Sequence, residues 1–248
     1  MESLPGKLLF EKYHQGSPVQ VCENLKRREL HFGNPMVQSA YSLKEPKYPL
    51  LRYTRQMLAG IALVPKLENV LHIGLGGGSI AKFLYDYFPR IEQTAIEINP
   101  LVIEAAYEYF ELPDDSRLKV IPKDIVESIN DLSGPYDLIF LDAFDHSGAS
   151  SCFDKILLQQ LQGFLSEEGW LVGNFIDQSE TLLLQKELWD SICSLTIEAK
   201  TAARMNTIVY GFQSNSFSLL EIEKRAYELE KTIPLRLLPL VKRFHFVN

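Results

Sequence analysis

The segment covering residues 70–100 constrains the fold more than any other part of the chain. It opens with a short apolar run, 70–73, of the kind found in a strand that is buried on both faces. The next five residues contain four glycines, Gly74, Gly76, Gly77 and Gly78. Glycine allows a sharp backbone turn and the close approach of a ligand. A helix begins near Ser79, which can cap it, and a second strand ends at Glu97. Together these elements predict a nucleoside-binding unit, in which Glu97 accepts hydrogen bonds from ribose hydroxyls.

The chain as a whole divides into three parts. From residue 66 onward, segments of strand and helix character alternate, which predicts an α/β fold with a mostly parallel, doubly wound sheet. Four short strand-like segments separated by turn sequences predict a small antiparallel β region over 1–50. We therefore predict a Rossmann-like nucleoside-binding catalytic domain over 51–215 and a C-terminal helical tail over 216–248.

Composition excludes several classes of partner. With 46% hydrophobic residues among 248, the chain can bury a sizeable core. It has no apolar run of membrane-spanning length and no signal-peptide core, so we expect a cytoplasmic protein without membrane contact. A net charge of −7 argues against nucleic acid as a partner, because neutralising phosphates requires a basic surface. The three cysteines lack metal-ligand spacing, and we expect no metal.

Acidic residues follow three successive strands of the predicted sheet. Glu97, Asp124 and Asp142 stand at these strand ends, and Asp145 comes three residues after the last of them. In a parallel sheet, ligands bind beyond the carboxyl ends of the strands. Glu97 can bind the ribose and Asp124 the adenine amino group, with the amide of Ile125 facing a ring nitrogen. The alternative for Asp124 is a helix N-cap, and for Asp142 and Asp145 it is loop capping.

Two ligand classes fit the glycine turn. A nicotinamide dinucleotide matches its spacing, except that Ser79 replaces the last glycine. A dinucleotide gives no reason for acidic ends on the third and fourth strands, whereas a cationic sulfonium is attracted by surrounding carboxylates. The sequence therefore favours a sulfonium derivative of adenosine.

Motifs along most of the chain resemble those of one family. They are the segment 28–39 ending in Gln38-Ser39, then Tyr53, the glycine turn 74–78, Glu97-Ile98-Asn99, Asp124-Ile125 and the run 136–145. Together they resemble the spermidine synthases (polyamine aminopropyltransferases) over about residues 5–215. The resemblance implies a seven-stranded class I methyltransferase (Rossmann-like) fold and a homodimer formed through the N-terminal sheet.

The resemblance also assigns roles to residues. The thioether nucleoside would be held by Gln38, Gly74, Gly76, Gly77, Glu97, Ile98, Asp124 and Ile125. Asp142 would accept the proton of the attacking amine, with Tyr53 beside it, and Asp145 would help anchor the amine. The co-substrate would be S-adenosylmethionine or its decarboxylated form, and the acceptor a small-molecule amine.

The chain departs from the family pattern around the aminopropyl group. Gly77 occupies the place of an Asp that holds the aminopropyl ammonium, Thr54-Arg55 replaces a His-Glu or Gln-Glu pair, and 204–208 replaces a Pro-Ser-Gly segment. Losing the Asp removes a charge-assisted hydrogen bond of about 1.5–3 kcal/mol. The nucleoside half of the predicted site thus keeps more of the family's residues than the aminopropyl half does. In this respect the sequence is similar to the divergent spermidine-synthase-like branch.

Three functions fit these observations. The first is a spermidine-synthase-like transferase of polyamine biosynthesis that moves an aminopropyl group to an amine, with Asp142 as the base. The second is an S-adenosylmethionine-dependent methyltransferase acting on a small molecule, which Gly77 makes a close competitor. The third is a non-catalytic protein that retains the nucleoside pocket.

Overall fold

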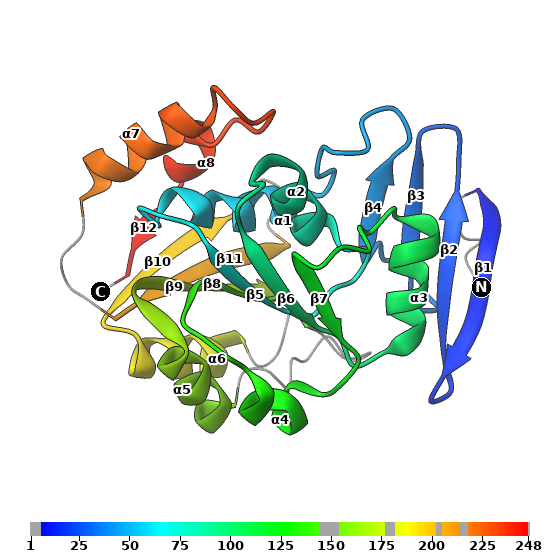
Figure 1. Ribbon diagram of the computed structural model, residues 1–248, viewed down its shortest axis with the longest axis horizontal. Coiled ribbons are helices and arrows are strands. Elements are labelled where there is room, and N and C mark those ends of the chain that lie inside the picture. The colour runs from blue at the N-terminus through cyan, green and yellow to red at the C-terminus, as the bar shows by residue number, and fades with distance from the viewer. Residues whose placement is uncertain (1–5, 144–153, 177–181, 202–204, 214–217, 248) are drawn as a thin grey trace.

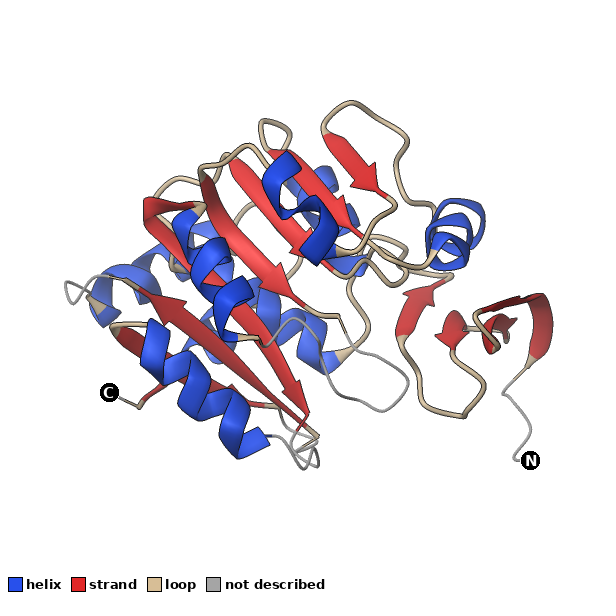
Figure 2. Cartoon of the chain, turned by 90° about the horizontal axis from the view of Figure 1, so that it is seen from below, coloured by secondary structure: helices blue, strands red, loops and turns tan. Residues whose placement is uncertain are grey.

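The computed structural model describes residues 6–143, 154–176, 182–201, 205–213 and 218–247 (Figure 1). It contains two sheets. The N-terminal sheet is antiparallel and has the order β1-β2-β3-β4. Its strands are β1 (Lys7–His14), β2 (Ser17–Glu23), β3 (Arg27–His31) and β4 (Ser39–Ser42). Figure 2 shows this sheet to one side of the main sheet, which confirms the predicted small β region.

The main sheet has the order β12-β10-β11-β9-β8-β5-β6-β7. Its strands are β5 (Asn69–Ile73), β6 (Glu92–Ile96), β7 (Leu118–Ile121), β8 (Tyr136–Leu141), β9 (Leu165–Ile176), β10 (Leu195–Lys200), β11 (Asn206–Phe212) and β12 (His245–Phe246). The strands from β5 to β9 run parallel, whereas β10, β11 and β12 pair antiparallel. The chain moves outward from β5 to β7 and returns as β8 on the other side of β5, which creates a topological switch point.

Helices cover both faces of the main sheet (Figure 1). They are α1 (Arg52–Leu58), α2 (Ser79–Tyr87), α3 (Pro100–Tyr109), α4 (Ile125–Ser128), α5 (Lys155–Gly163), α6 (Leu182–Ile192), α7 (Leu219–Leu229) and α8 (Leu238–Val241), with 3-10 turns η1 (Ala59–Ala62) and η2 (Ile129–Asp131). One core lies under α1, α2, α7 and α8, and a second lies under α4, α5 and α6. No helix in the described ranges is long and apolar enough to span a bilayer.

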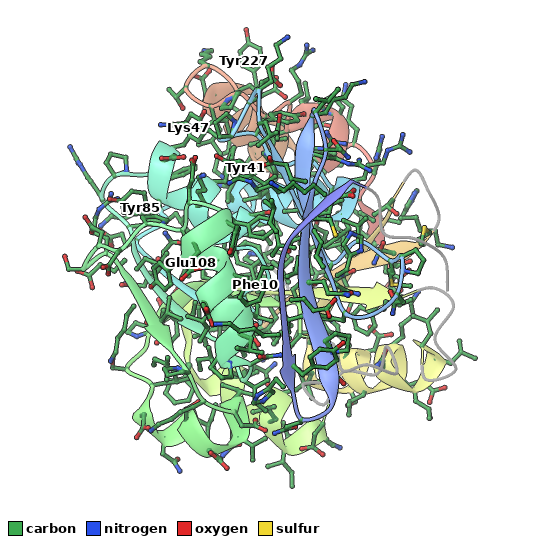
Figure 3. The ribbon with its side chains drawn as sticks, turned by 90° about the vertical axis from the view of Figure 1, so that its right-hand side faces the viewer. Phe10, Tyr41, Lys47, Tyr85, Glu108 and Tyr227 are labelled. Atoms are coloured by element: carbon green, nitrogen blue, oxygen red, sulfur yellow. The ribbon has the colours of Figure 1, made fainter. Side chains whose placement is uncertain are left out.

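Helix α3 connects the two sheets. It packs on β1 and β2 through a separate apolar cluster that includes Phe10, Leu30, Tyr41 and Phe110 (Figure 3). The alternation along β3 explains this packing, because Leu30 faces the cluster while its neighbours turn to the opposite face. The N-terminal sheet is thereby fixed against the nucleoside-binding unit, and β4 is brought next to the glycine turn.

Helix starts follow local sequence signals in most cases. Asn99 caps α3 by accepting a hydrogen bond from the amide of Leu101, with Pro100 at the first helical position, and both residue types favour a helix start. The predicted cap at Ser79 is wrong. Gly78 is the N-cap of α2, with φ of 72°, and Ser79 is the first residue of the helix. The left-handed backbone at Gly78 shifts the cap position by one residue.

Two features of the main sheet go beyond the sequence-based prediction. Gly169 lies within β9, where the pairing with β8 changes register between Tyr136 and Leu138. A Cβ at position 169 would lie 2.8 Å from the carbonyl oxygen of Tyr136, so close packing explains the glycine. The segment after residue 216 also adds β12, an eighth strand, to the seven that were expected.

The buried side chain of His72 makes the stability of the fold depend on pH in the acidic range. Its Nε2 lies 2.9 Å from Oε1 of Gln93 and its ring stacks on Phe140. Burial lowers the pKa of His72 to about 4. The unfolded chain binds this proton near pH 6.5, so the contribution of His72 to stability should fall as pH drops from 6.5 to 4, by at most about 3 kcal/mol. The free energy of unfolding of the unaltered protein minus that of His72→Gln, measured with urea, should fall as pH drops across this range. A difference that stays constant with pH would contradict the assignment.

Candidate active site

The ends of the parallel strands converge at one edge of the main sheet. The first residue after β5, β6 and β8 donates its backbone N–H to the last residue of a neighbouring strand. These bonds run from Gly74 to Ile96, from Glu97 to Ile121 and from Asp142 to Ile73, with N···O distances of 2.9, 3.1 and 2.9 Å. The glycine turn and two of the predicted carboxylates therefore lie side by side at the switch point, where α/β sheets bind ligands.

Glu97 is locked between the glycine turn and the start of α3. Its Oε2 accepts a hydrogen bond from the amide of Leu75 at 3.0 Å, and its Oε1 accepts one from the amide of Asn99 at 2.9 Å. Burial raises the pKa of Glu97, and these backbone amides oppose that rise. The carboxylate is thus held rigidly at the strand end, where it has further lone pairs for a ligand.

The first glycines of the turn are required by the protein's own packing. Gly74 has φ of 87°, and a Cβ there would lie 2.4 Å from the carbonyl oxygen of Asp142. Gly76 has φ of 53°, and its Cβ would lie 2.7 Å from Oγ of Ser39 on β4. Both positions need glycine because of the left-handed backbone and the close neighbours. The turn is therefore pressed against both β8 and the N-terminal sheet.

Gly77 lies in a filled environment. Its amide donates to Oγ of Ser39 at 2.8 Å, and a Cβ there would lie 2.9 Å from Cδ1 of Phe110. A cavity of only about 10 Å³ remains nearby, lined also by the buried Lys82. The Nζ of Lys82 donates to Glu111 at 3.1 Å and lies over the ring of Tyr41. A side chain at position 77 would therefore collide with Phe110, in a region that already holds a cation.

Asp142 has the environment of a general base. Its Oδ1 accepts a hydrogen bond from Nδ2 of Asn174 at 2.8 Å, and its carboxyl group also interacts with the Tyr53 hydroxyl. Burial raises the pKa of Asp142 to about 7, against the opposing effect of these two partners. A carboxyl group with a pKa near neutrality can both take up and release a proton at physiological pH.

Tyr53 links this carboxyl group to the N-terminal sheet. Its hydroxyl donates to the backbone carbonyl of Gln38 at 3.1 Å. Burial, followed by the charge of Asp142, raises the pKa of Tyr53 well above its usual value, so it stays a neutral donor. The structure thus brings Gln38, Tyr53 and Asp142 together, although they come from three separate parts of the sequence.

The remaining predicted residues have mixed positions. Asp124 caps α4, accepting a hydrogen bond from the amide of Val126 at 2.9 Å, so it does what the alternative assignment foresaw. Ile125 is buried, whereas Ile98 is 58% exposed beside the strand end. Asp145 lies outside the described residues. The binding roles of these residues remain predictions.

Sequence reasoning missed two asparagines. Asn174 on β9 is buried and bonds to Asp142, and Nδ2 of Asn206 donates to Oδ1 of Asn174 at 3.0 Å. The signal in the sequence was a single amide within the otherwise apolar run 170–176. A buried polar side chain needs hydrogen-bond partners, so its presence in a central strand points to a neighbouring polar group.

Comparison with known proteins shows the family to which the chain belongs. The model of the spermine/spermidine synthase domain matches residues 52–221, which is more than half of the chain. The chain belongs to the spermine/spermidine synthase family. The polyamine aminopropyltransferase of Chromobacterium violaceum is 30% identical over 236 residues, which cover 93% of this chain and 90% of that protein.

Other relatives of this family member carry a different activity. The eEF1A lysine and N-terminal methyltransferase of Xenopus laevis is 30% identical over 210 residues, which cover 76% of this chain but only 30% of that protein. The crystal structure of a spermidine synthase in complex with the transition-state analogue AdoDATO shares the fold, with a TM-score of 0.74 and 16% identity over 95% of this chain and 85% of that one. Aminopropyltransferases and methyltransferases are both transferases, which confirms the expected enzyme class and the class I methyltransferase fold.

Proposed function

We propose that the protein transfers an alkyl group from an adenosyl sulfonium, S-adenosylmethionine or its decarboxylated form, to an amine, with Asp142 as the base. One observation carries this proposal. A partly buried carboxyl group with a pKa of about 7 stands at the switch point beside the glycine turn, and Asn174 and Tyr53 hold it in place. A structural carboxylate gains nothing from such a pKa, whereas a general base does.

The proposed chemistry is an in-line displacement. The amine nitrogen forms a bond to the carbon beside the sulfonium, the carbon–sulfur bond breaks, and its electron pair neutralises the sulfur as a thioether. The proton leaves the nitrogen for Asp142. In this proposal Glu97 orients the ribose, and Tyr53 turns its single hydroxyl proton from the carbonyl of Gln38 to the Asp142 carboxylate and so keeps the carboxylate directed at the amine.

The surroundings of Gly77 favour methyl transfer over aminopropyl transfer. The family position for the carboxylate that binds an aminopropyl ammonium has no side chain here, and Phe110 fills the adjacent space. The nearby Lys82 is already paired with Glu111, so among the described residues no free carboxylate stands beside this position to hold an aminopropyl ammonium. Relatives with methyltransferase names are consistent with this preference.

Donor binding and product analysis test the proposal. Calorimetry should show binding of S-adenosylmethionine in preference to its decarboxylated form, and mass spectrometry should show methylation of one member of an amine panel. Aminopropyl addition would restore the first sequence-based prediction. Tight binding without turnover across the panel would favour the non-catalytic protein. Binding of NADH in place of either sulfonium would overturn the assignment.

Restoring the family Asp alone should not create aminopropyl transfer. In Gly77→Asp the new Cβ meets the Phe110 ring, so we expect a loss of about 1–3 kcal/mol of stability from overpacking and no gain in affinity for the decarboxylated donor. Gly77→Ala isolates the steric part, and Gly163→Ala serves as a control because nothing lies within 4 Å of its added Cβ. Thermal melting and calorimetry measure both effects. Tight binding of the decarboxylated donor by Gly77→Asp would contradict this view.

A further inference from the structure

Two amide side chains form a relay that ends on Asp142. Asn174 lies near the C-terminal end of β9 and is only 2% exposed. Its Nδ2 donates to Oδ1 of Asp142 at 2.8 Å, while its Oδ1 accepts from Nδ2 of Asn206 at 3.0 Å. Asn206 is the first residue of β11, which pairs antiparallel with β9. We refer to Asn206 and Asn174 as the amide relay.

The second amide fixes the orientation of the first. A buried amide can turn by half a rotation about its last side-chain bond and exchange its oxygen and nitrogen. If Asn174 turned in this way, its oxygen would face the carboxylate of Asp142 and its nitrogen would face the donor of Asn206, so both contacts would become unfavourable. Asn206 presents its Nδ2 to this contact and an ionised Asp142 can only accept, so in this arrangement Asn174 presents its own donor to Asp142.

The relay also lies in a part of the chain that departs from the family pattern. Asn206 belongs to the segment 204–208, which replaces the Pro-Ser-Gly segment of the family that the sequence resembles.

The Asn174 donor favours the ionised carboxylate of Asp142 and opposes the effect of burial on its pKa. A hydrogen bond from a buried amide also restricts the direction of the carboxylate lone pairs.

From this geometry we infer that Asn174 and Asn206 are positioning residues for the transfer, which aim Asp142 and set the pH at which it ionises. This inference rests on the proposed function of Asp142 as the base. The competing explanation is that the two amides only satisfy each other between β9 and β11, as buried polar pairs do in many sheets.

Titration of Asp142 separates the two explanations. Carbon-13 carboxyl NMR of the full chain, with the signal assigned by its absence in Asp142→Asn, measures the midpoint without any substrate. Asn174→Leu keeps the branched shape of the side chain but removes the donor, so the midpoint should rise by about one pH unit. Asn206→Ala should raise it by a smaller amount, because Asn174 then loses its fixed orientation. The pH profile of kcat/KM should move by the same amounts, with activity at pH 7 falling about fivefold for Asn174→Leu.

A matched control and two outcomes complete the test. Val209→Ala removes a buried side chain from β11 without touching the relay, so it should lower the melting temperature and leave the midpoint unchanged. Unchanged midpoints in both asparagine variants, with melting temperatures lowered as in Val209→Ala, would overturn the inference. If neither donor is turned over by the unaltered protein, the proposed function fails, and the NMR titration still decides whether the relay controls Asp142.

Discussion

Asp142→Asn should abolish transfer and at the same time make the fold more stable above neutral pH. Removing a general base costs about 10²–10⁴-fold in rate. The stability gain follows from linkage. The pKa of Asp142 is raised from 3.8 to about 7 in the folded protein, so the folded state binds this proton more tightly than the unfolded state. The contribution of Asp142 to the stability of the unaltered protein should therefore fall as pH rises from about 4 to 7, by at most about 4 kcal/mol.

The Asn variant has no such proton to lose. Its Oδ1 can still accept the Asn174 hydrogen bond, and we expect a gain of about 1–3 kcal/mol at pH 8. Urea unfolding at pH 5 and pH 8 measures the difference. Asp137→Asn is the control on the other end of β8, because Asp137 accepts hydrogen bonds from the amides of Glu68 and Asn69. It should lose about 1 kcal/mol and keep its activity. A destabilised Asp142→Asn would show that the carboxylate is structural.

Glu97→Gln should weaken binding of the sulfonium donor about 10–100-fold. The carboxylate accepts the amides of Leu75 and Asn99, one on each oxygen. An NH₂ group in place of one oxygen leaves one of these amides without an acceptor and removes an acceptor for the ribose. The glycine turn and the start of α3 lose their common anchor, so the binding edge becomes less well ordered.

Calorimetry with S-adenosylmethionine measures this effect. Glu108→Gln is a suitable control, because it removes the same charge from the exposed face of α3 (Figure 3). It should leave the donor affinity unchanged. Equal affinities for Glu97→Gln and the unaltered protein would exclude Glu97 from the nucleoside site and would weaken the assignment of the whole sheet edge.

The parts of the structure that were predicted correctly depend on local signals. The apolar runs at 70–73 and 136–141 become adjacent central strands, because strands buried on both faces must be apolar along their length. Asn99-Pro100 starts a helix through contacts that span only a few residues. The position of Glu97 and Asp142 at one edge follows from the parallel alternation alone.

Other features depend on contacts between distant residues. Asp124 reads equally well as an adenine ligand or a helix cap, and only the fold shows that it caps α4. Asn174 and Asn206 are 32 positions apart and meet because β9 and β11 pair. The two-residue β12 exists only because the end of the chain returns to β10.

The sequence by itself determined the βαβ unit, the carboxylates at its strand ends and the family, because periodicity and motif spacing are properties of short stretches of chain. Tertiary structure alone decided that Phe110 occupies the space beside Gly77 and that burial, opposed by Asn174 and Tyr53, raises the pKa of Asp142 to about 7. Both depend on desolvation and on side chains brought together from distant segments, and neither effect exists until the chain has folded.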